Sequence, residues 1–220
     1  MWPFKRKNHE ADPQRNLLAT IRELDRGYEV FGASSHRYKL TPVAPLELEA
    51  FEKWCGVDLP ASFRTHLLEV GYGAGPYYGL WSLTQVRKEL DGFYRDQENE
   101  PETQPRPSDL FPLSQSDAVN CQKRVIAGAE KPWITATWPL AGCLPIGHQG
   151  CEYYTVLQIT GDSPGAVWDI SECGYWLPAS CAPGINKTGR SIQPKQRFPP
   201  TFEAWFQSWI DRGISDLSRW

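Results

Sequence analysis

The chain has 220 residues with a formal net charge of -3, and 40% of them are hydrophobic and 13% aromatic, including 10 tryptophans. These proportions exclude a disordered chain, and the length suits one domain with a sizeable core. The small negative charge gives no general attraction to nucleic acid. The basic residues near the N-terminus precede no apolar run, and no uncharged stretch could cross a bilayer. We therefore expect a cytoplasmic protein that neither binds nucleic acid directly nor enters a membrane.

Apolar side chains recur at helical spacing in six segments, each bordered by a capping residue or a glycine. The last segment follows Thr201, a typical N-cap, and its apolar stripe is expected to be covered by a sheet. The stripe consists of Phe202, Trp205, Phe206, Trp209 and Ile210. The six predicted helices span 12–27, 45–56, 60–71, 84–93, 116–128 and 201–210.

Short runs rich in β-branched and aromatic residues predict strands at 77–83, 143–147, 153–159 and 166–170. Close turns separate the last three, which favours an antiparallel meander. The stretch 28–40 indicates a loose hairpin or loop, and the segments 96–109 and 179–200 are expected to be long loops. Together these elements predict an α+β fold in which short helices pack against a central, mainly antiparallel sheet.

Four motifs in a fixed order carry a resemblance to a known family. The first, residues 46–63, reads as a helix, a glycine, a Leu-Pro pair and a second helix. The others are Leu-Pro-Ile-Gly at 144–147 with Tyr153-Tyr154, Gly-Ala-Val-Trp at 165–168, and Thr-Phe-Glu-Ala-Trp-Phe at 201–206. In this order they resemble the SMI1/KNR4 (SUKH) superfamily over most of the chain.

The resemblance implies a domain organisation and a function. It implies an N-terminal extension with a short helix at 1–40, a SUKH-like domain at 41–213 with an insertion at about 84–141, and a tail at 214–220. Its members are mainly bacterial immunity proteins that neutralise a cognate polymorphic toxin, often a nuclease, by direct binding. The alternative is an interaction hub or scaffold without a toxin, as in fungal relatives.

The sequence contains no HExxH or GxxxxGK[ST] motif, and Gly161-Asp162-Ser163-Pro164-Gly165 is a turn between two predicted strands, so no enzymatic activity is predicted. The glycine-rich stretch 71–75 follows a predicted helix, whereas a dinucleotide fingerprint follows a strand. The best alternative is a minor enzyme that uses Cys151 and His148 as a thiol–imidazole pair, which requires the two groups to meet in space. Asp169 and Glu172 are either a carboxylate pair or a solvated strand end.

The six cysteines are expected to be reduced thiols, because the chain has no export signal. Cys143, His148 and Cys151, joined by Cys173 or Cys181, raise the question of zinc. However, no CxxC pair is present, and cysteine is often simply buried. No metal and no cofactor is therefore predicted.

If the protein inhibits a toxin that acts on nucleic acid, its partner presents a basic cleft, and an acidic, aromatic surface would suit it. Acids of the predicted loop would steer association, and residues near the sheet edge would hold the complex. The predicted partner-binding residues are Asp96, Glu98, Glu100, Glu102, Asp169, Glu172 and Trp176. Alternatively, the loop acids only keep the protein soluble, and Trp176 belongs to the core. We expect a monomer or a weak homodimer.

Overall fold

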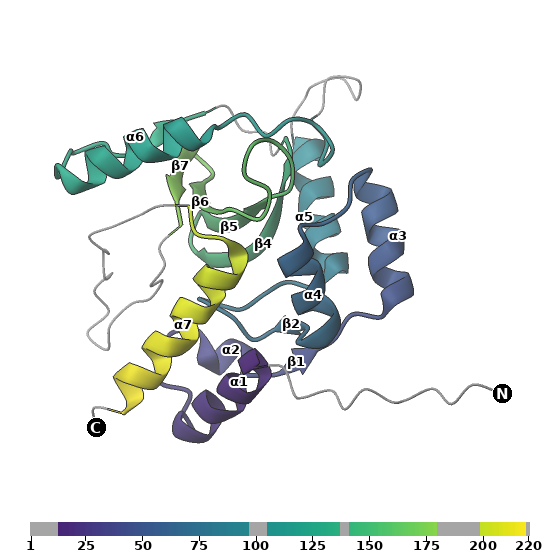
Figure 1. The fold of residues 1–220 in the computed structure, drawn as a ribbon, viewed down its shortest axis with the longest axis vertical. Helices are drawn as coiled ribbons and strands as arrows, with labels where there is room; N and C mark the ends of the chain where they lie inside the picture. Colours follow the sequence, from purple (N-terminus) through teal and green to yellow (C-terminus); the bar gives the residue numbers. More distant parts are fainter. Residues whose placement is uncertain (1–12, 97–104, 137–140, 180–198, 219–220) are drawn as a thin grey trace, which may run out of the picture.

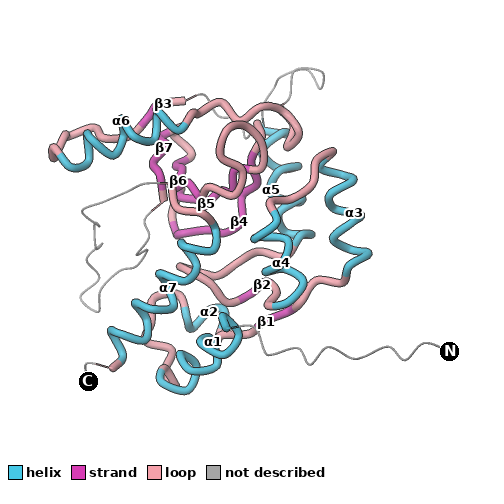
Figure 2. The backbone as a smooth tube through the Cα atoms, viewed as in Figure 1, coloured by secondary structure: helices cyan, strands magenta, loops and turns pink. Residues whose placement is uncertain are grey.

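The computed structural model describes residues 13–96, 105–136, 141–179 and 199–218. Within these residues the chain forms seven helices and two antiparallel sheets, so the fold is α+β, as predicted (Figure 1). Figure 2 shows the strands of the larger sheet gathered together with helices around them. The two predicted long loops lie mostly outside the described residues.

The larger sheet has five strands. In chain order they are β3 (Ile134–Thr135), β4 (Cys143–Gly150), β5 (Tyr153–Gln158), β6 (Val167–Ser171) and β7 (Tyr175–Pro178). Their spatial order is β3-β7-β6-β5-β4, and every neighbouring pair is antiparallel. The structure confirms the predicted meander of three strands. It adds β7 and β3, which are too short to carry a recognisable period.

All six predicted helices are present. The helices are α1 (Pro13–Leu24), α2 (Ala33–His36), α3 (Pro45–Cys55), α4 (Ala61–Glu69), α5 (Leu83–Asp96), α6 (Gln115–Ile126) and α7 (Phe202–Leu217). The seventh, α2, lies where a loose hairpin or loop was expected, and its four residues form a single helical turn between left-handed Gly32 and Arg37. Thr201 caps α7 as predicted, and Ser114 caps α6, two residues before the predicted start of that helix at 116.

Helices cover much of the apolar stripe of α7, so the expectation that the sheet covers it is wrong in part. Phe202 and Phe206 meet the ring of His66 in α4, with ring centroids 4.9 and 4.5 Å apart. Farther along, α7 lies beside α1, and Trp209 meets the ring of His36 at 5.9 Å (Figure 1). The N-terminal helix is therefore packed onto the domain.

A short segment, residues 79–81, joins the two sheets through backbone hydrogen bonds, and we call it the crossing segment. The smaller sheet pairs β1 (Leu40–Thr41) with β2 (Tyr72–Gly73). Gly73 and Leu80 exchange two backbone hydrogen bonds of 3.0 and 3.1 Å, and Trp81 N–H donates to the Ile146 carbonyl of β4 at 2.9 Å. The predicted strand at 77–83 is thus reduced to a bridge at Leu80 and one hydrogen bond from Trp81, which tie β2 to the edge of the larger sheet.

Gly79 makes this close approach possible. Its φ of 95° lies in the left-handed region, and a Cβ at this position would collide with the carbonyl oxygen of Gly73. Any other residue would strain the backbone and push the crossing segment away from β2.

We therefore expect Gly79→Ala to lower the free energy of unfolding by about 2–4 kcal/mol. Gly92→Ala is the matched control, because Gly92 lies in α5 with no atom near its Cβ position. This control should leave stability unchanged or raise it by up to about 1 kcal/mol. Urea unfolding of both variants measures the difference, and equal stabilities would contradict the role given to Gly79.

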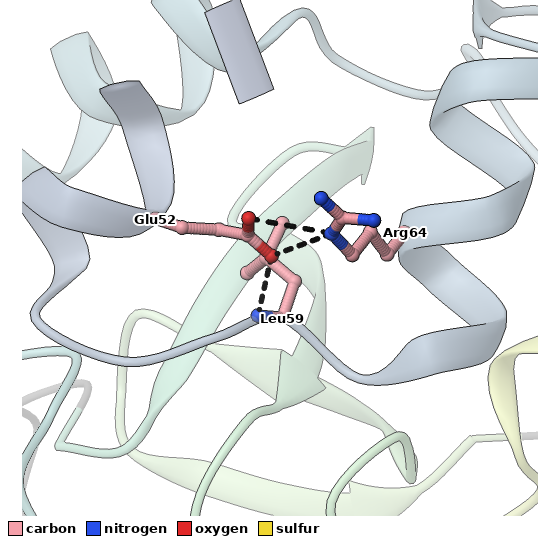
Figure 3. Close-up of polar contacts among 3 residues, drawn as sticks. All are labelled: Glu52, Leu59 and Arg64. Atoms are coloured by element: carbon pink, nitrogen blue, oxygen red, sulfur yellow. Dashed lines mark hydrogen bonds and ion pairs between the residues drawn. The ribbon is translucent and has the colours of Figure 1, made fainter. Parts of the chain in front are cut away.

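The turn between α3 and α4 is held by a buried carboxylate. Gly56 ends α3 in the left-handed conformation with φ 75°, as predicted, and the chain then reverses through Leu59-Pro60. Glu52 of α3 accepts a 3.0 Å hydrogen bond from Leu59 N–H and bonds Arg64 Nε of α4 at 3.2 and 3.3 Å (Figure 3). One side chain thus fixes the loop and pairs with the next helix.

Glu52→Ala should cost about 1–3 kcal/mol of stability, because it leaves the buried Leu59 N–H without its acceptor. Arg64→Ala should cost at most about 1 kcal/mol, since that side chain is 40% exposed and the ion pair is screened by water. Glu52→Gln keeps an acceptor oxygen and should fall between the two. Thermal or urea unfolding of the three variants checks the order; an Arg64 variant as unstable as Glu52→Ala would place the stabilisation in the ion pair instead.

Candidate functional site

The structure separates the residues predicted to bind a partner. Glu98, Glu100 and Glu102 lie outside the described residues, and Asp96 ends α5 with its side chain also outside them. Glu172 is exposed in the turn between β6 and β7. The other two predicted residues, Asp169 and Trp176, are buried.

Asp169 lies in the middle of β6, not at a solvated strand end. It is paired in register with Thr155 of β5 and Leu177 of β7, and only 6% of its surface is exposed. Gln149 Nε2 donates to Asp169 Oδ1 at 2.6 Å and to Thr155 Oγ1 at 2.9 Å. Asp169 therefore takes part in a buried polar cluster that holds three strands together, and it is not presented to a partner.

Trp176 belongs to the core, the alternative that the sequence left open. It is 0% exposed, lies opposite Ile170 and Ile134 on the neighbouring strands, and its ring centroid is 5.7 Å from that of Phe111. Tyr175 and Trp176 point to opposite faces of β7, and the sequence did not tell which of the two rings faces the core.

Two turns lie side by side at one end of the sheet. The turn between β4 and β5 contains Cys151 and Glu152, and the turn between β6 and β7 contains Glu172, Cys173 and Gly174. Glu172 N–H donates to the Glu152 carbonyl at 2.9 Å, so the β5–β6 ladder continues into both turns. This end of the sheet therefore presents two acidic side chains, Glu152 and Glu172, close together.

The buried Tyr154 holds the side chain of Glu172 by a hydrogen bond. Its hydroxyl donates to Glu172 Oε1 at 3.0 Å, and its ring lies between those of Trp81, Phe93 and His148. Burial, followed by the hydrogen bond to Glu172 and the charges of Glu172 and Glu89, raises the pKa of Tyr154 to about 12. The phenol therefore stays protonated at neutral pH and remains a hydrogen-bond donor that positions the exposed carboxylate.

Three exposed tyrosines lie at the same end of the sheet as the two turns. Tyr153 of β5 is paired with Ser171, and the β6–β7 register places Ser171 beside Tyr175. Residues level with one another in a sheet point to the same face, so both rings stand on one side of the sheet, about 10 Å apart. Tyr153 is 49% exposed and Tyr175 40%. Tyr78, 42% exposed, lies against the β4–β5 turn with its ring 6.1 Å from that of His148.

We call this region the turn-end surface and define it by Tyr78, Glu152, Tyr153, Glu172 and Tyr175. Sequence reasoning identified only Glu172 of these five. The signal for the others was present in the adjacent pair Tyr153 and Tyr154 beside a tight turn, because one ring of such a pair faces the core and the other faces away. Exposed tyrosines with flanking acids are suited to recognising a basic protein surface.

His148 holds the β4–β5 turn, and its ring nitrogens face the backbone. Gly150 N–H donates to Nδ1 at 3.2 Å, which places the ring proton on Nε2, and Nε2 lies 2.9 Å from the Cys151 carbonyl oxygen. Both nitrogens of His148 are therefore occupied by the turn, and neither is directed at the Cys151 thiol. The arrangement does not form the thiol–imidazole pair of the alternative interpretation.

The zinc candidates are also separated. Cys143 is buried in β4, whereas Cys151 and Cys173 are exposed in the turns, and Cys181 lies outside the described residues. Among the residues that the structure describes, no three His, Cys, Asp or Glu side chains gather as metal ligands would. None of the described helices combines the length and apolar character needed to cross a bilayer.

Comparison with known proteins identifies the family. The model of the SMI1 / KNR4 family (SUKH-1) matches residues 42–208, which include α3 to α6, the first part of α7 and the whole larger sheet. The chain therefore belongs to the SMI1/KNR4 (SUKH-1) family, as its motifs indicated. Searches of the curated proteins and of the solved structures gave no match.

Proposed function

We propose that this protein is a cytoplasmic immunity protein that neutralises a cognate bacterial toxin by binding it directly. Family membership supports this function, and the turn-end surface supplies a place for the contact. The exposed tyrosines carry the argument, because tyrosine is enriched at protein interfaces, where a large rigid ring loses little entropy on binding.

The charges at this surface indicate the chemistry of the partner. Glu152 and Glu172 are exposed on two turns that a backbone hydrogen bond joins. A toxin that cleaves nucleic acid needs a basic cleft, so these two exposed carboxylates would pair with Arg or Lys and block that cleft. We propose that the tyrosines provide most of the affinity and that the acids orient the toxin.

The direct test is co-expression with the toxin encoded beside this gene. Cells should survive and the two proteins should co-purify. In the purified complex, Tyr153→Ala and Tyr175→Ala should each raise Kd by about 10- to 100-fold. Glu152→Lys should weaken binding most at low salt, because screening reduces charge repulsion. Glu152 is preferred over Glu172 for charge reversal, since Glu172 also accepts the hydrogen bond from Tyr154.

The matched control is Glu49→Lys, an exposed acid on α3 outside the turn-end surface. It should leave Kd unchanged. A toxin that binds with the same Kd to all four variants would move the interface elsewhere. Stable capture of several proteins encoded far from this gene, with no protection from a neighbouring toxin, would instead identify an interaction hub.

The acids of the predicted loop have a separate expected effect. We propose that Asp96, Glu98, Glu100 and Glu102 steer the toxin before contact. Reversing their charge should slow association several-fold at low salt and leave dissociation nearly unchanged, because long-range charges act mainly on encounter. Stopped-flow mixing across a range of salt concentrations measures both rates. An unaltered association rate would leave solubility as the role of this loop.

A further inference from the structure

The N-terminal extension places an aromatic ring beside the turn-end surface. Phe31 lies between α1 and α2, before residue 42, where the match to the family begins. Its ring centroid is 5.6 Å from that of Tyr78 and 6.3 Å from that of Tyr77. Tyr78 belongs to the turn-end surface, and its ring also lies 6.1 Å from that of His148. These four residues form a continuous series of rings, which we call the aromatic row.

The aromatic row stays at the surface of the molecule. Tyr78 is 42% exposed, and the other three rings are half-buried. A single apolar side chain on a surface needs no explanation, whereas a contiguous apolar patch indicates a binding surface. Covering the row with a partner would remove apolar ring surface from water, which favours association.

The backbone under the row is held in a strained conformation. Tyr77 has a φ of 55°, in the left-handed region that a residue other than glycine adopts at a cost in energy. Gly32 approaches the carbonyl oxygen of Tyr77 so closely that a Cβ would collide with it. Ala33 N–H donates to the Val30 carbonyl at 2.9 Å, which closes a turn around Phe31. Such strain is concentrated at functional sites, and a ring on a fixed turn loses little freedom on binding.

Tyr78 connects the row to the acids of the turn-end surface. A Cβ at Gly150 would stand 3.4 Å from Cε2 of Tyr78 and 3.5 Å from its hydroxyl oxygen, so the ring packs on the β4–β5 turn. Glu152 is exposed in that same turn. A partner that pairs with this carboxylate is therefore brought to the aromatic row as well.

We infer that Phe31 is a specificity-determining contact for the toxin, and that an arginine of the toxin covers the aromatic row. The inference rests on the proposed function. The face of an aromatic ring attracts cations, and arginine is the cation that most often stacks on it. A basic cleft supplies this side chain. Because Phe31 lies outside the segment that the family model matches, the contact would let this chain discriminate its own toxin from others.

The first test measures binding of the full chain to the purified toxin encoded beside the gene. Phe31→Ala should raise Kd about 10-fold, and Phe31→Tyr, which keeps the ring, should stay within about twofold of the wild type. Phe31→Leu keeps apolar bulk without a ring face and should fall between them. Calorimetric titration at a temperature where thermal unfolding shows every variant to be folded gives the Kd values.

Photo-crosslinking separates a direct contact from an effect transmitted through Tyr78. The photoreactive amino acid p-benzoylphenylalanine keeps a ring at position 31, and irradiation should join it to the toxin. The matched control carries it at position 110. Leu110 is 75% exposed, and the neighbouring Phe111 N–H donates to Thr160 Oγ1 at the end of the β4–β5 pair opposite the turn. This control should give no crosslink.

The outcomes distinguish this inference from the proposed function. An unchanged Kd for Phe31→Ala, or no crosslink from position 31, overturns the inference and leaves the proposed function standing if Tyr153→Ala still weakens binding. Equal Kd values for Phe31→Leu and Phe31→Tyr overturn the stacked arginine. A toxin that does not bind the wild-type chain overturns both the inference and the proposed function.

Discussion

The arrangement of the molecule depends on the backbone contact that the crossing segment makes with both sheets. Leu80 completes the edge of β2, and the following Trp81 N–H bonds to β4, so one short stretch fixes the helical half of the chain against the five-stranded sheet. It also occupies part of the edge of β4, which would otherwise offer unpaired backbone groups to another chain. Gly79 permits this contact, because a side chain there would meet the backbone of Gly73.

Buried carboxylates hold the chain where it changes direction. Glu52 accepts Leu59 N–H after α3, and Asp25 accepts Glu29 and Val30 N–H after α1 at 2.6 and 3.1 Å. In each case backbone donors outside regular structure obtain a charged acceptor, which is a stronger partner than a neutral one. At the turn-end surface the partners are uncharged backbone groups and a histidine: the two turns are bonded to each other, and His148 is bonded to the β4–β5 turn.

Much of the fold could be predicted because its helices and meander strands are bordered by strong local signals. Thr201, Gly56 and the tight turns act through their own backbone conformation, whatever the rest of the chain does. The short elements could not be predicted because they lack such local signals. For example, β2 is two residues in a stretch that equally marks the end of a helix, and only its pairing with β1 makes it a strand. Asp169 was misplaced because β6 is buried on both faces. Its sequence therefore has no alternation of apolar and polar residues that would show whether Asp169 is exposed.

The packing of α1 beside α7 sets an order of events during synthesis. Ile21 of α1 is fully buried, yet the helix it lies against is the last described element of the chain. Until α7 has emerged from the ribosome, the apolar face of α1 has no helix to pack against. Contacts between segments so far apart in sequence form slowly, so α1 can pack only after α7 has been synthesised. Shortening the protein from its carboxyl end would therefore damage the amino end first.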